Sequence, residues 1–269
     1  MQRTSVGVGL IGFGAIAREL AALFGQSGAP GTRITVLLRP GSRTIATLPA
    51  GCTAVTSVAD LLALEPDIVV EAAGHEAVAT VIGDVIAGGV PVVVTSVGSL
   101  ADASLLDRLL RAADRAGTQI MIPSGAVGGI DYVGTLRDIH DAKVVYTSRK
   151  PPAAWSFELA VRGIDPCALR DEVVLFEGSA AEAARLYPQN LNVAATIALA
   201  GIGMERTQVR ILVDPTIERN THEIRTESRL GCAIMRFENF PSLINPKTSA
   251  VTAYSVYWLV LQRTAVLVV

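Results

Sequence analysis

The sequence predicts an α/β fold with two lobes: a doubly wound parallel sheet first, then an α+β lobe whose sheet is mostly antiparallel. Up to about residue 125, short valine and isoleucine runs alternate with helical patterns, which is typical of a parallel sheet covered on both faces. Beyond that residue the strands become longer and alternate polar with apolar positions, as in a half-covered antiparallel sheet. A last apolar segment, 247–263, is expected to be a helix that packs on the first lobe.

The elements of the first lobe alternate regularly, and right-handed crossovers between parallel strands would make the sheet doubly wound. Strands are expected at 5–13, 32–40, 67–74, 90–97 and 118–125. Helices are expected at 15–27, 57–64, 76–89 and 100–117.

The second lobe is expected to hold four strands and two helices. The strands are predicted at 143–150, 207–215, 221–228 and 232–239, and the helices near 178–186 and 192–201. The chain would then consist of a first domain of residues 1–125, joined by the C-terminal helix 246–269, and a second domain of residues 126–245. We expect a functional cleft between the two.

Composition argues against several classes of partner. A net charge of −2 over 269 residues argues against nucleic acid or an anionic membrane as the main partner. No apolar run reaches the ~18–20 residues that span a bilayer, and no signal peptide is expected. The three cysteines are scattered, which predicts free thiols in a reducing cytoplasm and no metal site. Only 18% of the residues are charged, which leaves room for a homodimer interface.

A glycine-rich turn joins the first predicted strand to the first helix. Residues 12–17 read Gly-Phe-Gly-Ala-Ile-Ala, a G-x-G-x-x-A fingerprint. The first glycine permits a tight turn, the second lets the backbone approach a pyrophosphate, and the helix N-terminus attracts its charge. This context predicts a Rossmann domain that binds NAD or NADP. The expected cofactor residues here are Gly12, Gly14, Ala15 and Ile16. The alternative is a glycine-rich turn without a nucleotide.

The end of the second strand bears on the choice of cofactor. An acidic residue there would hold the ribose hydroxyls of NAD, but this chain reads Leu-Leu-Arg-Pro-Gly-Ser-Arg at 37–43. Arg39, Ser42 and Arg43 could hold the extra phosphate of NADP, so we expect NADP to be accepted, with NAD as well. A solvated basic loop is the alternative.

Small residues end the next two strands of the first lobe. Ala72, Ala73 and Gly74 leave room for the ribose and phosphates of a cofactor, and Ser96 lies where the nicotinamide-side ribose is expected. His75 begins the following helix, where we expect a polar residue at a helix start rather than a catalytic group.

One histidine lies in a strand with alternating charges. Glu223, Arg225 and Glu227 point to one face, so His222 is expected on the other, covered face. If that face forms a wall of the cleft, His222 is suited to move a proton near neutral pH. A packed polar residue is the alternative.

Seven stretches spread along nearly the whole chain resemble the L-aspartate dehydrogenase family. They are, in order, GFGAIA, EAAGHEAV, PSGAVGGID, SRKPP, PQNLNVAATIALAG, NTHEI and NPKTSAVTAYS. The resemblance implies NAD(P)-dependent oxidation of L-aspartate to iminoaspartate, reversible from oxaloacetate and ammonia, and a contribution to the pyridine ring of NAD. It also implies that Ala126 and Asn192 contact the cofactor and that His222 is the active-site residue. The basic 37–43 loop departs from an NAD-preferring pattern.

A dicarboxylate substrate needs cationic or amide groups to hold it. Lys247, Thr248 and Ser249, at the start of the predicted last helix, are expected to bind the substrate, with ordinary helix capping as the alternative. Enzymes of the homoserine dehydrogenase or dihydrodipicolinate reductase type would share the first lobe, but their substrate-loop motifs are not found. A nucleotide-sensing protein without catalysis would keep the same lobe but would have no need of His222.

Overall fold

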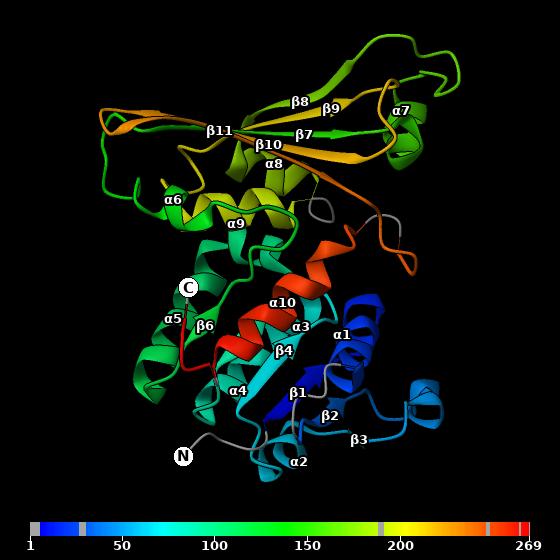
Figure 1. The fold of residues 1–269 in the computed structure, drawn as a ribbon, viewed down its shortest axis with the longest axis vertical. Helices are drawn as coiled ribbons and strands as arrows, with labels where there is room; N and C mark the ends of the chain where they lie inside the picture. The colour runs from blue at the N-terminus through cyan, green and yellow to red at the C-terminus, as the bar shows by residue number, and fades with distance from the viewer. Residues whose placement is uncertain (1–5, 27–30, 188–190, 246–247, 264, 269) are drawn as a thin grey trace. The chain divides into compact units, whose positions relative to one another are not determined.

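The computed structural model describes residues 6–26, 31–187, 191–245, 248–263 and 265–268 (Figure 1). The chain divides into two compact units. Unit 1 comprises Met1–Pro123 with Thr252–Val269, and unit 2 comprises Ser124–Val251.

Unit 1 is built on a six-stranded sheet in the order β3-β2-β1-β4-β5-β6, with every neighbouring pair parallel. This is the doubly wound sheet that the sequence predicts. The strands are β1 (Gly7–Ile11), β2 (Arg33–Leu37), β3 (Cys52–Val55), β4 (Ile68–Glu71), β5 (Val92–Val94) and β6 (Ile120–Met121). The helices are α1 (Ala15–Gln26), α2 (Val58–Ala63), α3 (His75–Thr80), α4 (Ile82–Ala87), α5 (Ala103–Ala116) and α10 (Val251–Gln262).

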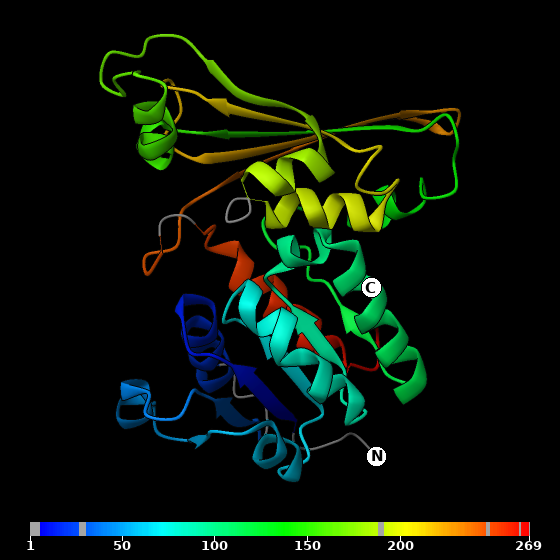
Figure 2. The ribbon, with the colours of Figure 1, turned by 180° about the vertical axis from the view of Figure 1, so that it is seen from behind.

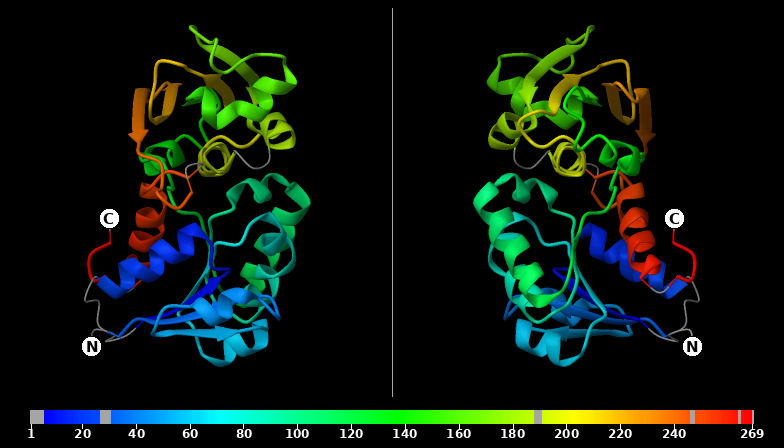
Figure 3. Two further views of the ribbon diagram at one scale, coloured as in Figure 1. Left: turned by 90° about the vertical axis from the view of Figure 1, so that its right-hand side faces the viewer. Right: turned by 90° about the vertical axis from the view of Figure 1, so that its left-hand side faces the viewer.

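Helices cover both faces of the unit 1 sheet (Figure 3). On one face, Leu20 of α1 and Val256 and Val260 of α10 share a hydrophobic core with Leu10 of β1. On the other face, α4 packs against α5 and buries Ile86 completely. Burial on both faces explains why these strands are apolar along their whole length.

Unit 2 contains a five-stranded sheet in the order β11-β10-β7-β9-β8. Its strands are β7 (Lys143–Lys150), β8 (Val173–Ser179), β9 (Gln208–Val213), β10 (Asn220–Ser228) and β11 (Gly231–Asn239). Neighbouring strands are antiparallel except for β7 and β9, which confirms a mostly antiparallel sheet. The helices are α6 (Ile130–Gly134), α7 (Ser156–Val161), α8 (Ala180–Leu186) and α9 (Asn192–Ala200). Helices α8 and α9 lie across one face of the sheet (Figures 1 and 2), over a core that includes Tyr146 and Ile224.

Several sequence-based boundaries were wrong. Strand β3 and helices α6 and α7 were not expected, because such short elements show too little of a period, and strand β8 was missed as well. In β8 the pairing register also shifts between Val174 and Phe176, which interrupts the alternation. The helix expected at 76–89 divides into α3 and α4, and the strand expected at 118–125 is reduced to β6. Within the described ranges, no helix is long and apolar enough to cross a membrane.

Candidate active site

The turn after β1 requires glycine at its first position. Gly12 has a φ of +81°, and a Cβ built on it would lie 2.8 Å from the Cβ of Ala73. The amide of Gly12 also donates to the carbonyl of Leu37 at 3.0 Å, which ties the turn to β2. A Cβ on Gly14 would lie 3.7 Å from the nearest protein atom, the carbonyl oxygen of Ala72, which is an ordinary contact. Packing therefore demands Gly12, whereas Gly14 leaves the turn open to a ligand.

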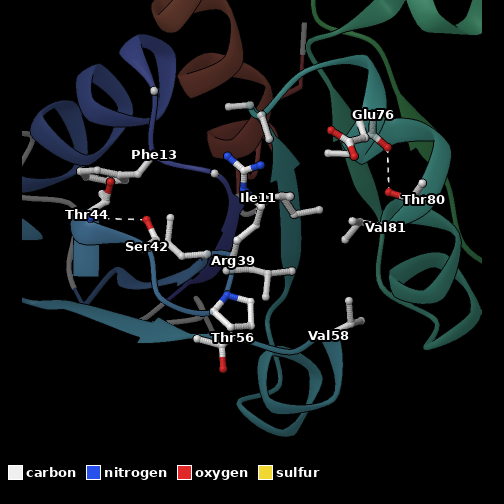
Figure 4. Close-up of a pocket in the computed structure, with 18 residues that line it drawn as sticks. Ile11, Phe13, Arg39, Ser42, Thr44, Thr56, Val58, Glu76, Thr80 and Val81 are labelled. Atoms are coloured by element: carbon white, nitrogen blue, oxygen red, sulfur yellow. Dashed lines mark hydrogen bonds between the residues drawn. The ribbon is translucent and has the colours of Figure 1, made fainter. Parts of the chain in front are cut away.

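A cavity of about 590 Å³ opens where β1, β2 and β4 end (Figure 4). This volume is within the usual range for a cofactor site, and α1 begins beside the cavity at Ala15. Five of the predicted cofactor residues line it: Gly12, Gly14, Arg39, Ala72 and Ala73. The other six are not among its lining residues: Ala15, Ile16, Gly74, Ser96, Ala126 and Asn192.

The part of the wall that follows β2 carries a cation and two hydroxyls. Arg39, Ser42 and Thr44 all line the cavity, and the Oγ of Ser42 accepts a hydrogen bond from the amide of Thr44 at 3.4 Å (Figure 4). Among the described lining residues, Glu76 of α3 is the single carboxylate. This wall can stabilise an anion, whereas Arg43 does not line it.

A buried carboxylate supports the rim of the same cavity. Glu71 ends β4 with no exposed surface, and its Oε1 accepts hydrogen bonds from the amides of Ala73 and Gly74 at 2.8 and 2.7 Å. The amide and the Oγ of Ser96 donate to the same side chain, each at 3.0 Å. Glu71 therefore holds together two of the predicted strand ends. The sequence reasoning did not single it out, although an acid closing an otherwise apolar strand was a usable signal.

His222 lies near the start of β10, between strands β7 and β11 of the unit 2 sheet. The register of β10 sets it opposite Ser148 of β7 and Phe237 of β11. His222 is 4% exposed, whereas Arg225 and Glu227 are exposed, so the predicted division of faces is confirmed.

The two ring nitrogens of His222 have different surroundings. Nδ1 lies 2.7 Å from the phenolic oxygen of Tyr146, which projects from β7 two residues before Ser148. Nε2 is buried and has no hydrogen-bond partner in the described part of the chain. Buried polar atoms are rarely left unpaired in folded proteins. The arrangement therefore holds one nitrogen in place and leaves the other available to a ligand.

Burial controls the charge of this pair. Burial first, and the nearby charge of Lys150 second, together lower the pKa of His222 from 6.5 to about 4. The imidazole is therefore neutral at neutral pH. Burial also raises the pKa of Tyr146 far above its ordinary 10, although a hydrogen bond with Ser148 acts in the opposite direction. The phenol therefore keeps its proton.

The glycine-rich loop at 124–129 packs against β11. The Nδ2 of Asn239 donates to the carbonyl of Ala126 at 2.7 Å, and Ala126 itself is buried. A Cβ on Gly128 would lie 3.3 Å from the ring of Phe237, the residue that pairs with His222. The fold of unit 2 thus brings Ala126 and His222, two predicted site residues, to the same end of β10 and β11.

The remaining predicted residues have mixed outcomes. Asn192 begins α9 and is exposed. Lys247 lies outside the described residues. Thr248 and Ser249 do not start a helix as expected, because α10 begins at Val251. Instead, the carbonyl of Thr248 accepts the amide of Ser242 at 2.7 Å, and Ser249 is buried.

Two residues beside His222 were also missed by the sequence reasoning. They are Tyr146, described above, and Lys150, which ends β7 and is only 8% exposed. Reading alternate positions of 143–150 would have placed both on the face that carries His222. The charge of Lys150 hid this, because a lysine is usually assigned to the solvent side.

The fold and the site together define a class of protein. A doubly wound sheet with a glycine-rich turn beside a cofactor-sized cavity, joined to a lobe with a buried histidine, is the plan of a two-lobe dinucleotide-dependent oxidoreductase. The family profile described as "Homoserine dehydrogenase, NAD binding domain" matches residues 12–123. This first lobe is shared among several dehydrogenases, so the second lobe has to distinguish them.

The profile described as "Aspartate dehydrogenase, C-terminal" matches residues 131–263. L-aspartate dehydrogenase 2 of Bordetella pertussis is 43% identical over 249 residues, which covers 93% of each chain. L-aspartate dehydrogenase of a Polaromonas species is 40% identical over 97% of this chain and 99% of its own. The crystal structure of aspartate dehydrogenase from Thermotoga maritima superposes with a TM-score of 0.78 at 27% identity, over 98% of this chain and 99% of that one. The chain belongs to the L-aspartate dehydrogenase family.

Proposed function

We propose that the protein oxidises L-aspartate to iminoaspartate with NAD or NADP. The observation that carries the proposal is the buried His222, with Nδ1 held by Tyr146 and Nε2 unpartnered among the described residues. Membership of the family supports the choice of substrate. Iminoaspartate can hydrolyse to oxaloacetate and ammonia, and the reverse reaction is chemically allowed.

Oxidation of an amino acid removes a hydride from Cα and a proton from the amino nitrogen. When bound, the nicotinamide supplies the acceptor for that hydride. His222 can take the proton at Nε2, because burial keeps the imidazole neutral. This role requires Nδ1 to carry a hydrogen and donate it to the phenolic oxygen of Tyr146. In this proposal Tyr146 fixes both the tautomer and the orientation of the ring.

The unit 1 cavity suits the cofactor, because Gly14 leaves the turn open and α1 begins beside it. Gly12, Gly14, Ala72 and Ala73 would hold the pyrophosphate and ribose. We also propose as cofactor residues four that do not line the cavity: Ala15, Ile16, Gly74 and Ser96. Ala126 and Asn192 are proposed to contact the nicotinamide, as the resemblance of their motifs to the family implies.

We propose that NADP is accepted as well as NAD. Arg39, Ser42 and Thr44 line the cavity after β2, where an NAD-specific site would carry an acid. Arg39→Asp should therefore raise the KM for NADP more than the KM for NAD. Arg43→Asp is the matched control, because Arg43 is exposed and does not line the cavity. An unchanged NADP/NAD ratio in Arg39→Asp would remove the phosphate argument.

The wider setting of the reaction is also a proposal. Iminoaspartate would feed formation of the pyridine ring of NAD, as the family resemblance implies. The cysteines Cys52, Cys167 and Cys232 are free, which supports a reducing compartment such as the cytoplasm. Exposed apolar side chains such as Phe157 and Leu186 support a homodimer, which light scattering can test. Lys247, Thr248 and Ser249 remain candidates for substrate binding.

The decisive experiment follows cofactor reduction at 340 nm with L-aspartate and each cofactor in turn. Wild-type protein should reduce at least one cofactor, and His222→Asn should bind that cofactor equally well while turnover falls by about 100-fold or more. The matched control is His140→Asn, since His140 is exposed. Cofactor binding without aspartate-dependent reduction would overturn the proposed activity, and normal turnover in His222→Asn would overturn the assigned role.

A further inference from the structure

Lys150 is a buried cation on the covered side of the unit 2 sheet. Its Nζ lies 5.3 Å from the centroid of the Trp155 ring, and Trp155 is itself almost fully buried. An aromatic face attracts an ammonium group. Burying a charged group costs free energy. Buried charged groups are therefore often found at functional sites, where a cation can stabilise negative charge.

The register of the sheet places Lys150 close to His222. Tyr146, Ser148 and Lys150 occupy alternate positions of β7 and therefore share one face. Ser148 pairs directly with His222, so Lys150 lies one step further along the same face, toward the start of β10. The charge of Lys150 reaches the imidazole, because together with burial it depresses the pKa of His222.

We propose that Lys150 binds a carboxylate of the dicarboxylate substrate beside His222, an inference that rests on the proposed function. Two buried polar atoms point to a ligand here: Nε2 of His222 and Nε1 of Trp155, neither of which has a hydrogen-bond partner among the described residues. An ammonium group strengthens hydrogen bonds to a negatively charged oxygen, and an indole N–H donates to one. A carboxylate therefore matches the chemistry of the side chains gathered here.

Binding of the carboxylate would also tune the base. A negative charge at Lys150 offsets the field that depresses the pKa of His222, so that pKa rises and the imidazole holds a proton more readily. Among the described residues of the paired strands, the ionisable groups on the face of the ring are Tyr146 and Lys150 from β7. On β11 the facing residues are Phe237 and Asn239, and the loop 124–129 has no ionisable side chain. His222 thus becomes the stronger base only when substrate is present.

A histidine NMR titration of the wild-type protein tests this without any variant. With saturating NAD, succinate should raise the pKa of His222, whereas butyrate, which has a single carboxylate, should do so much less. The resonance is assigned by its absence from His222→Asn. An unchanged pKa in the presence of succinate would overturn the inference. Because succinate is not oxidised, this result is independent of whether the protein oxidises aspartate.

Substitution provides the second arm. Lys150→Met should raise the KM for L-aspartate by about ten- to a hundredfold, the loss expected for one charged hydrogen bond, while the KM for cofactor stays within about threefold. It should also raise the pKa of His222, because the positive charge that lowers this pKa is removed. Lys150→Arg should recover part of the affinity. Lys143→Met is the matched control, because Lys143 lies on the same strand but is exposed. If the wild-type protein oxidises aspartate and Lys150→Met has an unchanged KM for aspartate, the inference about Lys150 is overturned while the proposed function stands.

Discussion

Burial of His222 should make the stability of the protein depend on pH between 6.5 and about 4. In the unfolded chain the imidazole takes up a proton below 6.5, whereas in the folded chain it does so only near 4. Between these values the unfolded state binds more protons, so stability is fully present above 6.5 and falls as the pH falls. A tenfold difference in proton affinity corresponds to about 1.4 kcal/mol. The difference between the two pKa values therefore corresponds to a full loss of about 3 kcal/mol.

Urea unfolding between about pH 8 and pH 4.5, followed by circular dichroism, measures this loss. His222→Asn removes the titrating ring and keeps a polar atom near Tyr146. Carboxylates titrate in both proteins, so the difference between the two curves isolates His222. Wild-type protein should lose stability more steeply than His222→Asn, and His140→Asn should follow the wild type. Parallel curves for wild type and His222→Asn, or an NMR titration that puts His222 near its ordinary 6.5, would refute the reasoning.

Four further substitutions test the roles of particular contacts. Tyr146→Phe should lower kcat by about tenfold or more and leave the cofactor KM unchanged, because Nδ1 of His222 loses the group that fixes its tautomer. Steady-state kinetics that give a kcat within about twofold of wild type would contradict this. Gly12→Ala should lower the melting temperature, because the new Cβ would lie 2.8 Å from the Cβ of Ala73 and residue 12 has a positive φ. Gly14→Ala should keep the melting temperature and weaken cofactor binding, and the reverse pattern would be inconsistent with the turn geometry. Glu71→Gln should destabilise the protein by roughly 1–3 kcal/mol and raise the cofactor KM, because an amide cannot accept all four hydrogen bonds. Calorimetry that shows no loss of stability in this variant would contradict the supporting role of Glu71.

Much of the fold was predictable because its signals are local. The first lobe alternates apolar strands with helices, and burial on both faces makes each strand visible without its neighbours. In β10 the alternation of charge was enough to place His222 on the covered face. Strand β8 was missed because its irregular pairing with β9 interrupts the period.

The candidate site was less predictable, because its contacts connect distant parts of the chain. Tyr146 and His222 are 76 residues apart and meet only through the pairing of β7 with β10. Glu71 bonds to Ser96, 25 residues away, and nothing in either segment specifies that pairing. Thr248 and Ser249 were expected at a helix start, but Thr248 bonds to Ser242, Ser249 pairs with Pro241, and α10 begins only at Val251.

The sequence by itself determined the two-lobe α/β plan, the glycine turn after β1 and the covered position of His222, since each depends on local spacing and backbone conformation. Only the tertiary structure decided which groups surround His222. Strand pairing brings Tyr146 to one ring nitrogen and the charge of Lys150 near the ring, and burial turns an ordinary histidine into a neutral one with a pKa of about 4. Solvent exclusion and long-range pairing are properties of the folded chain, so no local pattern could have shown them.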